Sequence, residues 1–367
     1  MSAAIDRRYM ALALSLGRRG QGRTWPNPAV GCVIVKDGRI VGRGSTAPGG
    51  RPHAEPQALA QAGPAARGAT AYVSLEPCAH HGKTPPCSQA LIDAGVARVV
   101  AAIEDVDPRV SGQGFAQLRD AGIEVTTGVL ADQAEADLSG FFIRTEQGRP
   151  MVTLKLANSF DGRIATASGD SQWITGPVAR RAVHAMRMRH DAVMVGAGTA
   201  RGDDPSLTVR DMGVDHQPVR VVVSRRLDLP LSGVLARTAK EVPVWICHGP
   251  DADDMLHRTW DGLGAKLISC DVTGGHLDPR SILQGLGAEG LTRVFCEGGG
   301  ALAASLLAAD LVDELVGFSA GVVIGAEGTP AIGAMGLARL SEAPRFDLVS
   351  SRPVGGDVMH VWKRSAA

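Results

Sequence analysis

Apolar and polar positions alternate in the first part of the chain between strand-like and helix-like patterns. Residues 29–35 and 39–43 form two short apolar runs on either side of Lys36-Asp37-Gly38, whose Asp-Gly pair supplies the positive-φ positions of a hairpin turn. Helix patterns then alternate with strand patterns, which predicts a three-layer α/β/α sandwich opened by an antiparallel hairpin. The further predicted strands are 70–75, 98–103 and 123–127, and the helices are 54–62, a segment after Pro86, 115–121 and a segment from 131.

The pattern breaks at Glu146-Gln147-Gly148-Arg149-Pro150, where glycine and proline end a helical stretch. We expect a domain boundary there, which gives domains 1–147 and 148–367. A second α/β series follows the break. Its predicted strands are 151–157, 191–195, 219–224, 242–247 and 293–296, and its predicted helices are 178–189 and 301–309.

Size and composition narrow the class of protein. A chain of 367 residues has room for two cores, and 44% hydrophobic with 21% charged residues is typical of a globular protein. No apolar run approaches the roughly 18 residues of a membrane span, and the N-terminus lacks the apolar region of a secretory signal. The 38 basic and 38 acidic residues balance, which argues against a nucleic-acid or membrane partner. We therefore expect a cytoplasmic enzyme acting on a small molecule, and a homo-oligomer.

Candidate chemistry begins with the cysteines. Six are scattered along the chain, which does not resemble a disulfide framework, and four of them lie in or beside apolar runs as expected of core residues. The other two cysteines, Cys78 and Cys87, and the nearby His53 supply two thiols and one imidazole as candidate metal ligands. Three protein ligands leave the fourth tetrahedral position of zinc for water, as in a catalytic site, so we expect one zinc ion per chain.

Glu55 lies two residues after His53, near the start of a predicted helix, where its carboxylate can reach a zinc-activated water. In zinc deaminases such a glutamate shuttles the proton to the ring nitrogen and the leaving amine. Pro77 and Pro86 directly precede the two cysteines, which suits turns entering helices whose N-termini favour thiolates. Each residue alone has an ordinary structural interpretation, but their combination indicates a zinc-dependent deaminase.

A glycine-rich turn, Glu297-Gly298-Gly299-Gly300, follows a predicted strand and opens a predicted helix. Its backbone amides could bind a phosphate, or the glycines could simply allow tight packing. It comes late in its domain, unlike the first-turn fingerprint of a dinucleotide fold.

These motifs together resemble a known family, the bifunctional deaminase-reductases of riboflavin biosynthesis, over nearly the full length. Residues 26–32, 52–55 and 75–87 are similar to its deaminase motifs, including the long segment between the cysteines. Residues 154–162, 171–175 and 195–210 are similar to its reductase half. Two positions depart from the family pattern: Thr46 stands where members often have histidine, and Pro56 follows the glutamate.

The resemblance implies a cytidine-deaminase-like domain followed by a dihydrofolate-reductase-like domain that uses NADPH. It also implies site residues. His53, Cys78 and Cys87 would bind zinc, Glu55, Lys155 and Glu297 would be catalytic, and the substrate contacts would be Asn27, Lys83, Ser171, Arg187, Leu207, Arg210 and Glu297. The cofactor would be lined by Ala157, Trp173, Thr199, Asp203, Ser224, Gly299, Gly300, Ala301, Leu302, Ala303, Ala304 and Ser305.

The expected function is hydrolysis of the 2-amino group of 2,5-diamino-6-(5-phosphoribosylamino)-4(3H)-pyrimidinone. NADPH-dependent reduction of the ribosyl group of 5-amino-6-(5-phosphoribosylamino)uracil to ribityl would follow. Two alternatives stay open at the level of the residues. One is a nucleotide or tRNA deaminase with a non-catalytic C-terminal scaffold, and the other is a silent zinc-binding or nucleotide-sensing module.

Overall fold

The computed structural model describes residues 3–80 and 85–365 and divides into two compact units, Met1–Gly148 and Arg149–Ala367. The helix at the end of the first unit stops at Gln147, as the glycine and proline predict. Gly148 follows in the left-handed conformation, with φ 70°, and its N–H donates to the carbonyl of Arg144.

The first unit is built on a five-stranded sheet, over the residues described, in the order β2-β1-β3-β4-β5. Strand β1 pairs antiparallel with β2 and β3, and β3, β4 and β5 run parallel, so the predicted opening hairpin is confirmed. The elements are α1 (Ala3–Arg18), β1 (Gly31–Lys36), β2 (Arg39–Ser45), α2 (Ala54–Ala62), β3 (Thr70–Val73), α3 (Cys87–Asp93), β4 (Arg98–Ala101), α4 (Gln113–Asp120), β5 (Glu124–Thr126) and α5 (Ala131–Gln147).

Helices cover both faces of this sheet because successive strand residues point to opposite sides. Val33 of β1 is buried in one cluster with Met10 of α1, whereas Ile34 is buried in a second cluster with Ala58 of α2. Leu91 of α3 belongs to the second cluster as well. The predicted three-layer α/β/α architecture is therefore confirmed.

Glycines in β2 bring α2 close to the sheet. A Cβ atom at Gly44 would lie 2.1 Å from the carbonyl oxygen of Ala54, and one at Gly42 would lie 2.1 Å from that of Ala58. No side chain fits at such distances from backbone, so both positions need glycine. The first turn of α2, which carries Glu55, is thereby held against the hairpin.

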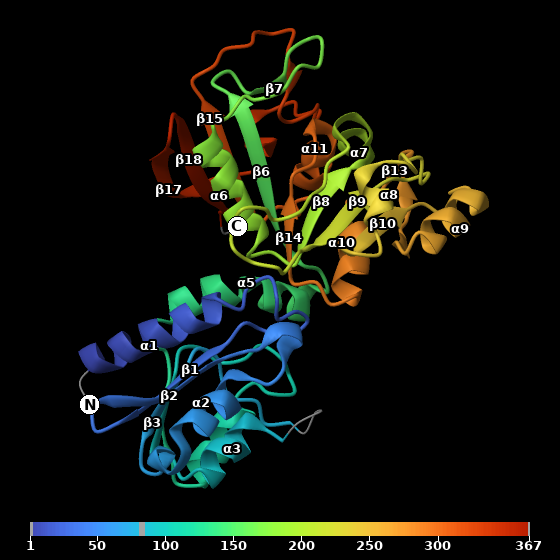
Figure 1. Cartoon of the computed structure of the whole chain (residues 1–367). Helices are drawn as coiled ribbons and strands as arrows, with labels where there is room; N and C mark the ends of the chain where they lie inside the picture. Colours follow the sequence, from blue (N-terminus) through green and yellow to red (C-terminus); the bar gives the residue numbers. More distant parts are fainter. Residues whose placement is uncertain (1–2, 81–84, 366–367) are drawn as a thin grey trace. The chain divides into compact units, whose positions relative to one another are not determined.

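The second unit contains a nine-stranded sheet, over the residues described, in the order β11-β10-β9-β8-β14-β6-β15-β18-β17. All neighbouring pairs from β11 to β15 are parallel, and the C-terminal hairpin β17–β18 adds two antiparallel strands at one edge (Figure 1). The principal elements are β6 (Met151–Ser159), β7 (Arg163–Ala165), α6 (Pro177–Arg187), β8 (Ala192–Gly196), α7 (Ala197–Asp203), β9 (Val219–Val223), α8 (Val234–Arg237), β10 (Val244–His248), α9 (Asp254–Gly262), β11 (Lys266–Ser269), α10 (Pro279–Ala288), β14 (Arg293–Cys296), α11 (Gly300–Ala308), β15 (Glu314–Ala320), β17 (Phe346–Val354) and β18 (Asp357–Arg364). Two small ladders, β12 (Val272–Thr273) with β13 (His276–Leu277) and β7 with β16 (Thr329–Pro330), lie outside this sheet.

The predicted elements of the second unit are incomplete, most of all in the last third of the chain. No strand was expected after residue 309, yet β15, β17 and β18 complete the sheet. Strand β17 is exposed at seven consecutive positions from Asp347 to Pro353, so it lacks the in-and-out alternation by which a strand is recognised. None of the described helices is both long and apolar enough to cross a membrane.

Candidate functional site

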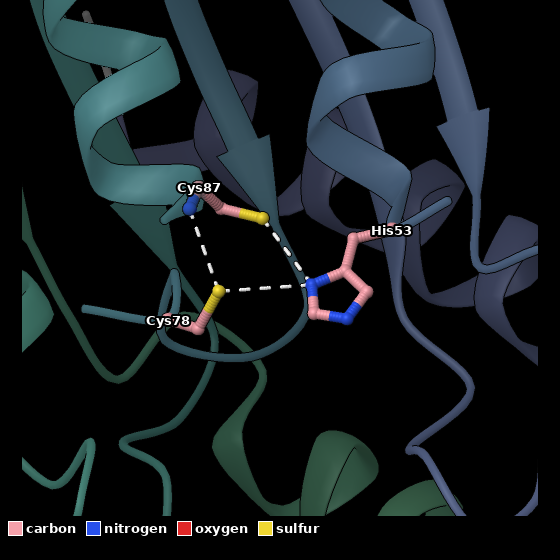
Figure 2. A group of neighbouring side chains, drawn as sticks. All are labelled: His53, Cys78 and Cys87. Carbon is pink, nitrogen blue, oxygen red and sulfur yellow. Dashed lines mark hydrogen bonds between the residues drawn. The ribbon is translucent and has the colours of Figure 1, made fainter. Parts of the chain in front are cut away.

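Three side chains from separate segments of the first unit converge on one point (Figure 2). His53 directly precedes α2, Cys78 lies in the segment after β3, and Cys87 is the first residue of α3. His53 Nδ1 is 3.3 Å from Cys87 Sγ and 3.7 Å from Cys78 Sγ, and the three ligand atoms all lie within 4.8 Å of one another. The structure thus brings together the three predicted ligands.

The donor set of this cluster fits zinc. One nitrogen and two sulfur atoms are ligand types that zinc prefers, and three protein ligands leave one coordination position open. Hydrogen bonds from Cys87 and His53 lower the pKa of Cys78 to about 4, despite its partial burial. The lowered pKa favours the thiolate of Cys78, the form that binds metal.

Only one of the two cysteines is at a helix terminus. Cys87 opens α3, whereas Cys78 lies in non-helical backbone, so the prediction that both enter helices is wrong for Cys78. The Cys78 sulfur is instead held by a hydrogen bond from the backbone N–H of Cys87, at 3.4 Å (Figure 2).

Glu55 is the second residue of α2 and its side chain is buried. Burial is the largest cause that raises its pKa, followed by the Cys78 thiolate, and together they bring it to about 7. The neighbouring His53 acts in the opposite direction. A carboxyl group with this pKa can both accept and release a proton near neutral pH.

Asn27 and Thr46 differ in whether their side chains can contact a ligand. The Asn27 Nδ2 group donates to the carbonyl of Gly50 at 2.8 Å, which leaves its Oδ1 atom as the group able to accept a hydrogen bond from a ligand. The Thr46 hydroxyl is buried and accepts the backbone N–H of Val30 at 3.0 Å, so it serves the backbone. Lys83, the predicted phosphate contact, lies outside the described residues.

Residues that were not assigned a role hold the cysteines in place. The Ser88 hydroxyl donates to the carbonyl of Cys78 at 3.1 Å, and it lies 2.6 Å from Oε1 of Gln117 on α4. The Glu76 carboxylate accepts four backbone N–H groups, two from the segment before α4 and two from the first turn of α4, at 2.9–3.2 Å. Glu76 stands in the motif before Cys78, but nothing in the sequence indicates which segment it contacts.

The second unit contains a cavity of about 550 Å³ that collects many of the predicted reductase residues. It lies where the carboxyl ends of parallel strands meet, a usual place for a ligand site. The predicted residues that line it are Lys155, Ala157, Ser171, Trp173, Arg187, Thr199, Asp203, Leu207, Arg210 and Glu297.

Charged groups form a network on one wall of this cavity. Arg187 donates from two nitrogens to the Glu297 carboxylate, at 2.5 and 3.2 Å, and Lys155 Nζ lies 3.8 Å from the same group. Burial lowers the pKa of Lys155, opposed by Glu297. Burial raises the pKa of Glu297, but Arg187 and Lys155 outweigh it, so the pKa is lowered and the group is ionised.

The remaining predicted cofactor residues are not among those lining this cavity. Ser224 follows β9 and bonds to Asp228, and Ala303 and Ala304 of α11 are buried. The glycine-rich turn does lie beside the cavity, since a Cβ atom at Gly299 would be 3.6 Å from the Thr199 hydroxyl. As predicted, the turn joins a strand, β14, to a helix, α11.

Several residues that line the cavity were given no role from the sequence. They include Thr175, Arg180, His184 and Ser206. Arg180 and His184 lie on α6 at helical spacing from Arg187, a pattern that could have indicated them. An arginine-rich helix face is more often solvated, however, so the spacing alone could not decide.

Comparison with known families identifies both halves. Residues 3–103 match the model of the cytidine and deoxycytidylate deaminase zinc-binding region, and residues 150–360 match the model of the RibD C-terminal domain. The chain is 43% identical to the riboflavin biosynthesis protein RibD of Escherichia coli K12 over 359 residues, which cover 96% of this chain and 98% of that protein. It is 39% identical to RibD of Aquifex aeolicus, over 99% of this chain and 100% of that protein.

Solved structures agree in fold. Acinetobacter baumannii RibD (form 2) superposes with a TM-score of 0.87 at 36% identity, covering 99% of each chain. A diaminohydroxyphosphoribosylaminopyrimidine deaminase/5-amino-6-(5-phosphoribosylamino)uracil reductase from Thermotoga maritima superposes with a TM-score of 0.86 at 33% identity, again covering 99% of each chain.

Proposed function

The chain belongs to the RibD family of bifunctional riboflavin-biosynthesis enzymes, and from this premise we propose which of its residues carry each of the two reactions. The first domain is a zinc-dependent deaminase of the phosphoribosylated diaminopyrimidine, and the second is an NADPH-dependent reductase of the deaminated product. The C-terminal half is therefore an enzyme domain and not a scaffold.

For the deaminase we propose that His53, Cys78 and Cys87 hold the zinc ion. The supporting observation is the convergence of their three ligand atoms within 4.8 Å, together with the buried carboxyl group of Glu55 in the first turn of α2, directly after His53. Zinc in such a site supplies the Lewis acid that makes water nucleophilic near neutral pH.

We propose that Glu55 carries the proton. Its carboxylate accepts one proton of the attacking water and passes it to the ring nitrogen as the oxygen bonds to the carbon. It then takes the second proton from the resulting hydroxyl and passes it to the amine, which leaves as ammonia when the C–N bond breaks. Burial supports this role, because a pKa of about 7 lets the same group act as base and then as acid. Asn27 accepts a hydrogen bond from the pyrimidine through Oδ1, and Lys83 remains a proposed contact of the substrate phosphate.

The substitution Glu55→Gln tests this assignment, because glutamine keeps the size of the side chain but cannot carry the proton. We expect ammonia release to fall by at least about 10³-fold while the zinc content, measured by metal analysis, stays near one per chain. The retained zinc controls for folding of the first domain, and reduction of the deaminated substrate by the same polypeptide should remain. Retained deamination with zinc bound would overturn the role of Glu55.

For the reductase we propose that Lys155 and Glu297 act on the ring-opened C=N form of the aminoribose. NADPH supplies the hydride when bound. Lys155 Nζ delivers the proton that the substrate nitrogen gains, and burial favours this because it lowers the lysine pKa. Glu297, held by Arg187, keeps Lys155 oriented and balances the positive charge.

We propose that the other cavity residues divide between the two ligands. Ser171, Arg187, Leu207 and Arg210 contact the substrate, and its phosphate suits the arginines because a guanidinium can pair with two oxygens at once. Support comes from their common position in the cavity wall. The proposed cofactor contacts are Ala157, Trp173, Thr199, Asp203, Ser224 and residues 299–305.

A homo-oligomer in the cytoplasm also remains a proposal. Light scattering on the purified chain would test the oligomer, with a mass above the monomer's 38.1 kDa as the expected result.

A further inference from the structure

One side of α6 presents a row of polar groups to the reductase cavity. Arg180, His184 and Arg187 are spaced four and three residues apart, so they lie above one another on the same face of the helix. All three line the cavity, together with Ser206 and Arg210 from the segment after α7. Neither Arg180 nor His184 has a part in the reaction as proposed above.

Some of the cationic side chains in this cavity face a carboxylate and others do not. Arg187 and Lys155 both face the Glu297 carboxylate. Among the described residues, no carboxylate lies within ion-pair distance of Arg210 or Arg180. The Arg210 guanidinium donates to the Ser206 hydroxyl, and Arg180 donates to the carbonyl of Thr175 and stacks over Trp173 at 4.5 Å. Asp203 and Asp204 also line the cavity, but among the described residues neither forms an ion pair with Arg210. The Arg210 charge therefore lies beside Ser206 without a carboxylate partner, as a bound anion requires.

The ring of His184 is held in one orientation by backbone. The N–H of Arg210 donates to His184 Nδ1 at 3.2 Å, so this nitrogen must keep its lone pair. In the neutral ring the hydrogen is consequently on Nε2. Partial burial, followed by the charges of Arg187 and Arg210, lowers the pKa of His184, which favours the neutral ring. Among the described residues, Nε2 has no hydrogen-bond partner.

We propose that His184 is a substrate-binding residue of the reductase, whose Nε2–H donates a hydrogen bond to the phosphate of the substrate beside Arg210 and Ser206. The backbone of Arg210 orients the ring through Nδ1, its side chain bonds to Ser206, and all three residues line the same cavity. A neutral donor next to a guanidinium is suited to a phosphate, since it adds a directed hydrogen bond without a further charge. This inference rests on the proposed reductase function and adds a residue to its phosphate site.

Two substitutions separate this role from a merely structural one. In His184→Asn the amide oxygen can take the place of Nδ1 and keep the contact with the Arg210 backbone, but no donor remains at the Nε2 position. In His184→Gln the amide nitrogen can occupy the Nε2 position and keep the donor. Arg181→Ala, at an exposed position of the same helix, is the matched control.

We expect His184→Asn to raise the KM for the phosphoribosylated substrate about tenfold or more, with kcat and the KM for NADPH little changed. The dissociation constant of ribose 5-phosphate, measured by calorimetry, should rise by the same factor. His184→Gln and Arg181→Ala should stay within about threefold of the wild type. An unchanged KM for NADPH, which binds in the same domain, reports that the variants are folded.

The proposal is overturned if His184→Asn binds ribose 5-phosphate like the wild type. Equal weakening in the Asn and Gln variants also overturns it, because that result means that only the structural contact matters. If the Asn variant does not fold, nitrogen NMR of the wild-type histidines decides. The His184 Nε2–H signal should shift with ribose 5-phosphate and not with ribose, and an unmoved signal overturns the proposal. A wild-type chain that oxidises no NADPH with the deaminated substrate would instead refute the proposed function itself.

Discussion

The proposed zinc ligands come from two short stretches, residues 53–55 and 76–87, whereas the reductase cavity is lined by residues spread from Lys155 to Glu297. The first site is formed where the end of one strand and the starts of two helices meet. Its residues therefore lie within short segments of the chain and can be recognised as sequence motifs. The second is formed where several parallel strands end side by side, and residues far apart in the chain become neighbours only through the order of the strands. A site of the first kind can be found from spacing, while one of the second kind needs the topology.

After the loss expected for Glu55→Gln, the largest effect is expected at the distributed site. Glu297→Gln removes the charge that pairs with Arg187 and Lys155, so two cations lose their partner and Lys155 loses its orientation. We expect NADPH oxidation with the deaminated substrate to fall about 10²–10³-fold, while ammonia release in the first domain is unchanged.

Glu289→Gln is the control, since that glutamate is exposed and pairs with Lys266 away from the cavity. Reduction at the wild-type rate in Glu297→Gln would show that the ion pairs of Glu297 with Arg187 and Lys155 do not matter for the reaction. A parallel loss of deamination would show that the two sites are not independent.

A second effect concerns the stability of the reductase domain. His190 is buried, donates through Nδ1 to the carbonyl of Met186 and accepts through Nε2 from the Thr153 hydroxyl. Burial lowers its pKa from 6.5 to about 4, so protonation favours the unfolded chain. The stabilisation is complete above pH 6.5 and is lost as the pH falls towards 4, by about 3 kcal/mol.

Denaturant unfolding followed by tryptophan fluorescence over this pH range measures the loss. In His190→Gln, whose amide does not titrate, the pH dependence should flatten. An equally steep profile in this variant would mean that other groups cause the acid destabilisation.

The smallest of the three effects concerns zinc affinity. It tests whether the residues of the zinc motif bind the metal at full affinity without support from other segments. Gln117 lies on α4, outside both zinc stretches, yet it bonds to Ser88, which holds the carbonyl of Cys78. We expect Gln117→Ala to weaken zinc binding about tenfold in a chelator competition, because the partners of metal ligands orient them. Gln89→Ala, on the exposed face of α3, should bind zinc like the wild type. Equal affinities in both variants would show that the local motif needs no such support.

The first domain could be predicted closely from its pattern. The helix over 54–62 and the hairpin around Asp37-Gly38 were found because turn chemistry and apolar spacing are local properties. The second domain was predicted less completely. Strand β17 lacks alternation, and short elements such as α8 (Val234–Arg237) offer too few residues for a period to show.

The amino-acid sequence by itself determined the imidazole and thiol groups at 53, 78 and 87, the carboxylate at 55 and the glycine-rich turn after β14, because each depends on residue identity and on spacing within one motif. Only the tertiary structure decided which groups these residues meet. It placed Cys78 in a loop held by Ser88 and Gln117, turned the Thr46 hydroxyl to the backbone, and put Glu297 between Arg187 and Lys155. The physical reason is that hydrogen bonds and ion pairs act over a few ångströms in space, and the distance between two side chains is set by how strands and helices pack and not by their separation along the chain.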